Sequence, residues 1–270
     1  MCVTCSNCNK EIHKDFSYCP YCGAKNYDGL PKMVYHYTKK CTLCSIAEGI
    51  QEEDFFLWAN NYEKMNDPTD CRYLLHLFQK QIKEDKRDNI SKINTPYLVS
   101  FSRNGDDLHM WNCYADTGKG VSIGIDYNEL QKALDEYSKD GHITARLYSC
   151  KYLDESQVSN YEEIGTYIQK LRDTNNPYYL ANEELPYIIK HPAYREEDEF
   201  RIILLNSSLY YQSKKCNHDK EKDIFKIPIP KTAIKEIIVG PCADKGQIEK
   251  QFQSFFPEKE FKTSQIPYCI

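Results

Sequence analysis

The sequence has no run of about eighteen apolar residues, the length that a membrane-spanning helix requires. Its first residues, MCVTCSNCNKEIHK, also lack the apolar stretch of a secretory signal. Internal repeats and low-complexity segments are absent as well. These absences lead us to expect a cytoplasmic protein with no membrane contact.

An excess of positive charge, typical of proteins that grip the nucleic-acid backbone, is missing too. The formal net charge is -5 and the pI is about 5.9. Nonspecific binding to nucleic acids is therefore disfavoured, although a local site remains compatible with this balance.

The motifs of several common enzyme classes are absent. DTGKGVS resembles a phosphate-binding P-loop, but Cys113 stands where its first glycine belongs and Gly120 replaces the Ser or Thr after the lysine. There is no G-x-S-x-G, no H-E-x-x-H, and the seven histidines are not spaced as metal ligands. The chemistry must therefore be sought in less common patterns.

Cysteine is abundant, and its spacing carries the strongest single signal. The 13 cysteines are an odd number without a secretory signal, which argues against a disulfide framework. Two C-x2-C pairs form a C-x2-C-x10-C-x2-C pattern that resembles a short zinc ribbon over residues 1–28. The four predicted zinc ligands are Cys5, Cys8, Cys19 and Cys22.

Two further cysteine pairs share the C-x2-C spacing. Cys2 could replace Cys8 as the partner of Cys5, while Cys41 and Cys44 fall in an expected helix and are interpreted as packing residues. Fewer than thirty residues cannot bury a core, so zinc would supply the folding energy of the ribbon. Its lysines are balanced by acids, which favours a structural role or docking to a protein partner.

Residues 29–270 are expected to form one α+β domain, because strands and helices mix without a steady alternation. Expected helices cover 39–49, 71–84, 127–138, 155–173, 180–190, 244–256 and the segment DDLHMWNCYAD. Expected strands cover VYHYT, DFFLWAN, PYLVSFSRN, GKGVSIGIDY, ITARLYSCKYL, EFRIILL, IFKIPI and IKEIIVG.

The segment AYREEDEFRIILL places four consecutive acids before an apolar run. Its alternation predicts a strand on which Glu197, Glu199 and Arg201 share one face and the intervening apolar residues face a core. Such a face could act on a ligand. The plainer interpretation is a solvated edge with Glu–Arg pairs of little energetic value.

A set of short motifs carries a family resemblance. YHYT, MNDP, VSFS, MWNCYAD, GKGVSIGID, YREEDEFRI and IKEIIVG, in this order between about 33 and 242, resemble the bacterial domain of unknown function 2971. Tyr194 stands where that family usually has tryptophan. The resemblance implies no activity, but it suggests a stress or phage-defence setting, such as a toxin that modifies nucleic acid or protein.

A weaker resemblance, in the order of three motifs, is to ADP-ribosyltransferases. These enzymes hold NAD in a split sheet, with a His or Arg on the first strand, Ser-x-Ser on a middle strand and Glu-x-Glu on a late one. The corresponding residues here are His36, Ser100, Ser102, Glu197 and Glu199. The resemblance implies a split-sheet fold and NAD as the substrate.

The resemblance also implies roles in breaking the glycosidic bond of NAD. Glu199 would stabilise the positive charge that develops on the ribose and hold a ribose hydroxyl, while Glu197 would orient or deprotonate the acceptor. His36 would bind the adenosine ribose or a phosphate.

Other residues would complete this NAD site. Ser100 and Ser102 would shape it, Tyr37 or Tyr114 could stack on nicotinamide, and Arg201 could pair with Glu199 or take a phosphate. Taken singly, a core histidine, ordinary strand serines and a core tyrosine are plainer interpretations of these positions.

Two other classes of function stay open. A metal-dependent nuclease or hydrolase could bind magnesium through Asp67, Glu197 and Glu199, because magnesium favours carboxylate oxygens. A non-catalytic sensor or partner-binding module could use the ribbon for docking, with an unidentified protein or nucleic acid as the partner.

Overall fold

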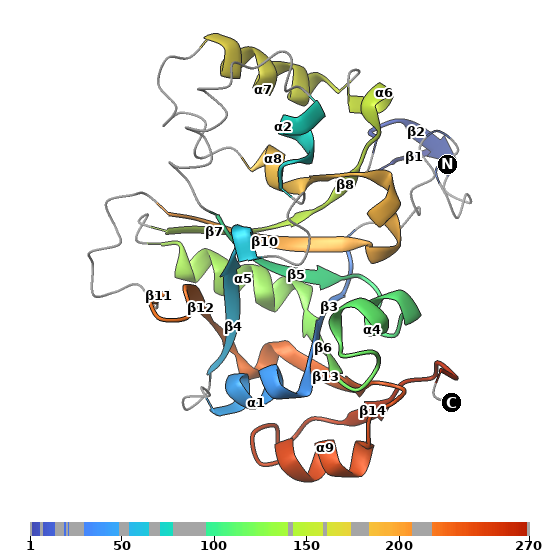
Figure 1. Cartoon of the computed structure of the whole chain (residues 1–270), viewed down its shortest axis with the longest axis vertical. Helices are drawn as coiled ribbons and strands as arrows, with labels where there is room; N and C mark the ends of the chain where they lie inside the picture. Colours follow the sequence, from blue (N-terminus) through green and yellow to red (C-terminus); the bar gives the residue numbers. More distant parts are fainter. Residues whose placement is uncertain are drawn as a thin grey trace.

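The computed structural model describes residues 2–5, 8–13, 19, 21, 30–48, 54–64, 71–77, 96–139, 143–158, 161–173, 184–206 and 218–268. It has a mixed α+β architecture in which helices surround one large sheet (Figure 1). Across these residues we find no helix that is both long and apolar enough to cross a membrane.

The N-terminal region contains a small hairpin. Strands β1 (Cys2–Thr4) and β2 (Glu11–His13) pair antiparallel, and Ile12 is buried with two of the predicted zinc ligands. Figure 1 places this hairpin beside α6 and β8.

The main sheet has ten strands within the described residues, in the order β11-β12-β4-β5-β3-β6-β13-β14, with β10 and β7 branching from β5. The strands are β3 (Met33–Thr38), β4 (Asp54–Asn61), β5 (Tyr97–Ser102), β6 (Val121–Asp126), β7 (Ile143–Ser149), β10 (Glu199–Asn206), β11 (His218–Asp219), β12 (Ile224–Pro230), β13 (Ile234–Val239) and β14 (Phe261–Thr263). Two short parallel strands, β8 (Lys151–Tyr152) and β9 (Ile189–Lys190), lie outside it.

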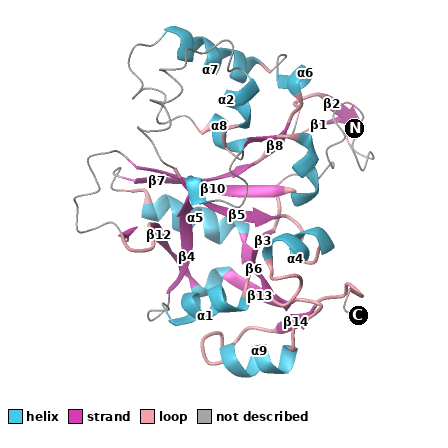
Figure 2. Ribbon diagram, in the orientation of Figure 1, coloured by secondary structure: helices cyan, strands magenta, loops and turns pink. Residues whose placement is uncertain are grey.

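The sheet divides at β5. Strand β10 follows one edge of β5 from Ser102 to Tyr97, while the other edge pairs with β3 at Ser102 and with β4 at Leu98 and Tyr97. Strands β3 and β4 then separate, because β3 continues along β6 and β4 along β12 (Figure 2). The division places the start of β10 beside the end of β5 and the start of β3.

The helices cover both faces of the sheet. They are α1 (Lys40–Glu48), α2 (Tyr73–Leu77), α4 (Leu108–Tyr114), α5 (Tyr127–Tyr137), α6 (Glu155–Val158), α7 (Glu162–Asp173), α8 (Leu185–Ile188) and α9 (Lys245–Phe252). Asp107, Asp126 and Asp244 cap α4, α5 and α9 through backbone N–H groups of the first turn. One large apolar core packs against α1, α5 and α9, and a second core packs under α2, α6, α7 and α8.

Most expected elements exist, with different bounds. The helices expected at 39–49 and 127–138 correspond to α1 and α5. Of the helix expected at 180–190, residues 180–183 lie outside the described residues, and the described part contains α8 followed directly by β9. Pro186 lies in the first turn of α8, and the chain turns extended at Ile189. Cys242 takes part in a disulfide bond, although the odd number of cysteines argued against a disulfide framework.

The acidic segment differs from its prediction in one respect that matters for the site. Pro192–Glu197 forms a 3-10 helix, Asp198 ends it in the left-handed region with φ of 43°, and β10 begins at Glu199. Glu197 therefore does not lie on the strand with Glu199 and Arg201. An aspartate tolerates the left-handed conformation better than most residues, which permits the sharp change of direction.

Candidate functional site

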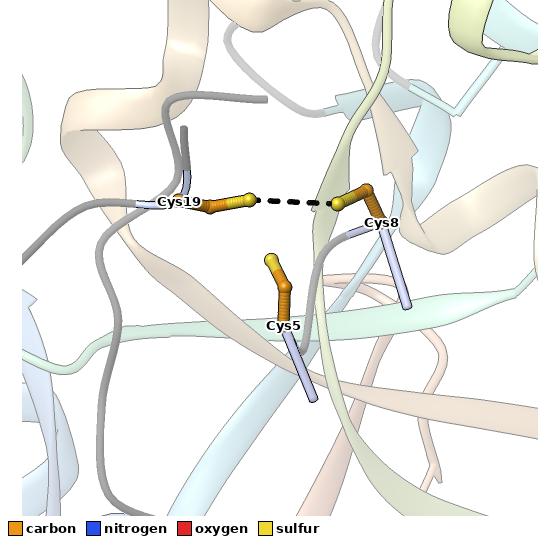
Figure 3. Close-up of side chains that lie close together, drawn as sticks. All are labelled: Cys5, Cys8 and Cys19. Carbon is orange, nitrogen blue, oxygen red and sulfur yellow. Dashed lines mark hydrogen bonds between the residues drawn. The ribbon is translucent and has the colours of Figure 1, made fainter. Parts of the chain in front are cut away.

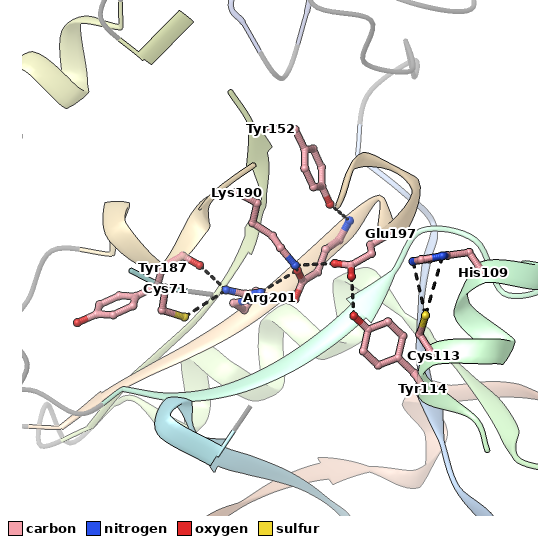
Figure 4. A network of polar contacts seen from close by, with 10 residues as sticks. Cys71, His109, Cys113, Tyr114, Tyr152, Tyr187, Lys190, Glu197 and Arg201 are labelled. Carbon is pink, nitrogen blue, oxygen red and sulfur yellow. Dashed lines mark hydrogen bonds and ion pairs between the residues drawn. The ribbon is translucent and has the colours of Figure 1, made fainter. Parts of the chain in front are cut away.

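A buried network of two acids and two bases lies where β10 begins. The Lys190 Nζ atom lies 2.5 Å from Glu197 Oε2 and 2.8 Å from Glu199 Oε2, and Arg201 pairs with Glu199 (Figure 4). All four side chains are at most 6% exposed. Equal numbers of opposite charges make this burial tolerable, because an unpaired buried ion is strongly destabilising.

Glu199 is held by a two-pronged contact with Arg201. Arg201 Nε donates to Oε1 at 2.9 Å and Nη2 donates to Oε2 at 2.8 Å. Burial alone would raise the pKa of the Glu199 carboxyl, but Arg201 and Lys190 outweigh burial and hold this pKa well below its usual range. Glu199 is thus a fixed carboxylate at neutral pH.

The other side of Arg201 contacts the second core. Its Nη1 atom donates to the Tyr187 carbonyl at 2.7 Å and lies 3.5 Å from Cys71 Sγ. The Tyr152 hydroxyl accepts a hydrogen bond from the Glu199 backbone N–H at 2.8 Å. The guanidinium is therefore buried under α2 and α8 with its donors engaged.

Glu197 faces helix α4. The Tyr114 hydroxyl donates to Glu197 Oε1 at 2.5 Å, and Tyr114 is itself only half-buried. Cys113 and His109, on the same helix, are exposed, and the thiol lies 3.8 Å from His109 Nε2. Burial and the Glu197 charge raise the pKa of Cys113. Of the two acids in the network, Glu197 is thus the one that lies next to exposed residues.

The two predicted serines lie beside this network. Ser102 pairs with Glu199 and Ser100 pairs with Arg201 across the β5–β10 ladder, so they share a face of the sheet. Ser102 is fully buried, and its Oγ accepts from the Asn104 backbone N–H at 3.1 Å. Ser102 thereby fixes the turn that leaves β5.

His36 lies on the opposite face of the sheet, contrary to the prediction that it joins Glu197 and Glu199. Tyr35 is the residue of β3 that pairs with Ser102, and side chains alternate along a strand, so His36 points the other way. Its ring lies 5.7 Å from that of Phe101, and Nδ1 lies 3.0 Å from the Ser100 carbonyl oxygen. Burial lowers the pKa of His36.

Tyr37 shares a face with the network but serves the backbone. Its hydroxyl donates to the Asn104 carbonyl at 2.9 Å and accepts from the Asp107 N–H at 3.0 Å. The ring packs edge-on against Trp111 with centroids 4.8 Å apart. At 6% exposure, Tyr37 ties the end of β5 to α4 and has little surface on which nicotinamide could stack.

Sequence reasoning missed four members of the network: Lys190, Tyr152, Tyr187 and Cys71. A signal for Lys190 was present, because a lysine that closes the apolar run YII is unusual unless it is paired. Its Nζ also lies 5.0 Å from the ring centroid of Tyr194, the residue that stands where the sequence motifs of the resembled family usually have tryptophan.

Three of the predicted zinc ligands converge at the N-terminal hairpin, where Cys5 and Cys8 lie between β1 and β2 and Cys19 follows β2. The Sγ atoms of Cys5, Cys8 and Cys19 all lie within 4.8 Å of one another, and those of Cys8 and Cys19 are 3.6 Å apart (Figure 3). A tetrahedral site with zinc–sulfur bonds of about 2.3 Å separates its sulfurs by about 3.8 Å, so the arrangement fits zinc. Cys22 lies outside the described residues.

Comparison with known proteins gives one match. Residues 110–202 match the model of a family described as Protein of unknown function (DUF2971). This segment is narrower than the 33–242 range over which the sequence motifs resemble that family. A search of curated proteins and a search of solved structures each found no match.

The matched segment runs from the first turn of α4 to the start of β10. It contains Tyr114, Lys190, Glu197, Glu199 and Arg201, the ionic network with its tyrosine at the α4 side. The cysteine hairpin, β3 and β5 lie outside it. The two acids and two bases are thus part of the region that resembles the family.

Proposed function

We propose that the chain transfers ADP-ribose from NAD to a protein or nucleic-acid acceptor, and that Glu197 is the carboxylate that meets the substrate. The observation that carries the proposal is the junction of β3, β5 and β10. There Glu199 at the start of β10 pairs with Ser102 of β5, and Lys190 links Glu199 to Glu197. The family resemblance suggests that the chain acts as a bacterial toxin or as a phage-defence effector.

The contacts of the two acids favour Glu197 over Glu199 for this role. Glu199 accepts two hydrogen bonds from Arg201 and one from Lys190, whereas Glu197 accepts one from Tyr114 and one from Lys190. Substrate could replace the Tyr114 hydroxyl at Glu197 Oε1 without breaking an ion pair. Glu199 then acts as a positioning residue that holds Lys190, and Arg201 holds Glu199.

The chemistry needs a fixed negative charge beside the ribose. The bond between nicotinamide and ribose C1′ breaks, nicotinamide leaves with the bonding electrons, and positive charge develops on the ribose. The Glu197 carboxylate stabilises this charge more than it stabilises the ground state. A nucleophile of the acceptor then bonds to C1′, and its proton passes to Glu197 or to solvent.

A non-catalytic partner-binding module is the second candidate, and one observation favours it. Every charge in the network is paired and buried, which suits a purely structural role. The magnesium-dependent hydrolase loses support, since Lys190 and Arg201 already contact both oxygens of Glu199 and one oxygen of Glu197. Asp67, the third acid in that hypothesis, lies outside the described residues.

The test is release of nicotinamide from NAD by the purified full chain, with and without total nucleic acid and cell protein. We expect release that falls at least about 100-fold in Glu197→Gln, the scale of a lost charge-stabilising group. Glu196→Gln, the same change at an exposed neighbouring acid, should retain full release. No release and no NAD binding by a folded wild-type chain would contradict the proposal and favour the binding module.

We also infer that the cysteine hairpin holds one structural zinc ion. Three converging thiols at a spacing suited to zinc support this. Elemental analysis should find one zinc per chain in the wild type and none in a Cys5→Ser/Cys19→Ser variant. A metal-free wild type purified from zinc-supplemented cells would contradict it.

A further inference from the structure

The turn that carries the cysteines also carries a residue that reaches the main domain. Asn9 follows Cys8 in the left-handed region with φ of 57°. Its backbone N–H donates to the Cys5 carbonyl, and the Cys5 N–H donates to the Lys10 carbonyl, both at 2.9 Å. The backbone that aims Cys5 and Cys8 at a common point therefore also sets the direction of the Asn9 side chain.

The Asn9 side chain contacts a residue 152 positions along the chain. Its Nδ2 atom donates to the Tyr161 hydroxyl at 3.2 Å. Tyr161 lies directly before α7 and is 8% exposed, and Lys151 Nζ lies 5.3 Å from its ring centroid. Figure 1 shows the hairpin on the same side of the molecule as α6 and β8.

Tyr161 belongs to the apolar core that covers the ionic network. That core also contains Tyr187 and Cys71, whose carbonyl oxygen and thiol contact Arg201. A continuous set of packed residues thus runs from the cysteine turn to the guanidinium that holds Glu199.

We propose that metal binding at the cysteine hairpin stabilises the α6–α8 cover of the ionic network through the hydrogen bond between Asn9 and Tyr161. Among the described residues of this region, the buried core consists of Cys5, Ile12 and Cys19, which is too small to fold without the metal. A ligand that binds only the folded hairpin stabilises whatever the folded hairpin contacts. This inference rests on the proposed zinc site and is independent of NAD chemistry.

The experiment is hydrogen exchange of the full chain, read by mass spectrometry, with zinc bound and after chelation. One hydrogen bond of about 1 kcal/mol corresponds to about fivefold in local opening. We expect peptides that cover 161–173 and 184–190 to exchange about fivefold more slowly with zinc. Peptides from β6 should not change, because β6 lies in the other core.

Two single substitutions isolate the contact. Asn9→Gly keeps a residue that suits positive φ but removes the donor, and Tyr161→Phe removes the acceptor hydroxyl. Both variants should bind one zinc and lose the zinc-dependent protection of 161–173. Glu11→Gln, an exposed change in the same hairpin, should keep that protection.

Three outcomes would overturn the coupling. The first is a wild-type chain that binds no zinc, and the second is one that binds zinc without protection of 161–173. The third is full protection in Asn9→Gly. None of these readouts uses NAD. If the chain shows the zinc-dependent protection but releases no nicotinamide, the coupling stands and only the proposed transferase activity is contradicted.

Discussion

Two charged clusters lie at opposite ends of β5, and they neutralise their carboxylates in different ways. At the Ser102 end, Glu199 is buried and meets Arg201 and Lys190. At the Tyr97 end, Asp223 is 30% exposed and receives the Tyr97 hydroxyl at 2.6 Å.

The second cluster relies largely on neutral donors. Asn61 Nδ2 donates to Asp223 Oδ2 at 2.9 Å, and Lys64 Nζ, on a side chain that is 53% exposed, lies 3.2 Å from the same oxygen. Water can solvate a half-buried acid, so neutral donors suffice there. A fully buried acid has no such solvent, so it requires buried cations. The difference suggests that removing a cation lowers the free energy of unfolding strongly at the Ser102 end of β5 and only slightly at the Tyr97 end.

The largest effect should follow Arg201→Met. It leaves one cation, Lys190, for two buried carboxylates, so we expect a loss of about 3–5 kcal/mol in the free energy of unfolding. Lys64→Met is the matched change at the other cluster and should cost less than about 1 kcal/mol. Urea denaturation of both variants measures the two losses in the free energy of unfolding. Equal losses would contradict the proposed difference between the two clusters.

An intermediate effect is expected for Asp223→Asn. Burial raises the pKa of Asp223, but hydrogen bonds from Tyr97 and Asn61 outweigh it and hold this pKa below its usual range. The carboxylate therefore contributes stability that is complete above the unfolded-state pKa of about 4 and is lost as the pH falls below it.

The substitution should cost about 1–2 kcal/mol at pH 7 and flatten the loss of stability below pH 4. Thermal unfolding from pH 7 to pH 2.5, compared with the wild type, measures both. If the variant loses stability below pH 4 as steeply as the wild type does, Asp223 is not the group responsible for the acid-induced loss of stability.

The smallest net effect should come from removing a whole ion pair. Glu199→Leu/Arg201→Met leaves Lys190 and Glu197 balanced, and apolar replacement of a buried pair is often nearly neutral. The double variant should therefore recover most of the stability that Arg201→Met loses, again by urea denaturation. A double variant as unstable as the single one would mean that packing of the guanidinium, rather than charge balance, holds the site.

Several elements were predictable because their signals are local. Helix α5 begins at the Asp126 cap and has apolar residues at helical spacing, and β10 alternates charged and apolar residues at its start. The convergence of Cys5, Cys8 and Cys19 was likewise contained in the spacing of the pairs.

The candidate site was only partly predictable. The sequence identified Glu197, Glu199, Arg201 and Tyr114, but the cation between the acids, Lys190, lies on β9, which pairs with β8 outside the main sheet. His36 was misplaced because the pattern of a strand does not reveal its register. Pairing of Tyr35 with Ser102 sends His36 to the far face.

The sequence by itself determined which segments are strands, which helices are capped, and that acids precede β10. Those properties depend on neighbours a few residues apart. Only the tertiary structure decided which side chains of each strand share a face and which cations contact Glu197 and Glu199. It also decided the contact between Asn9 and Tyr161. These depend on strand register and on contacts between distant segments, which local periodicity does not encode.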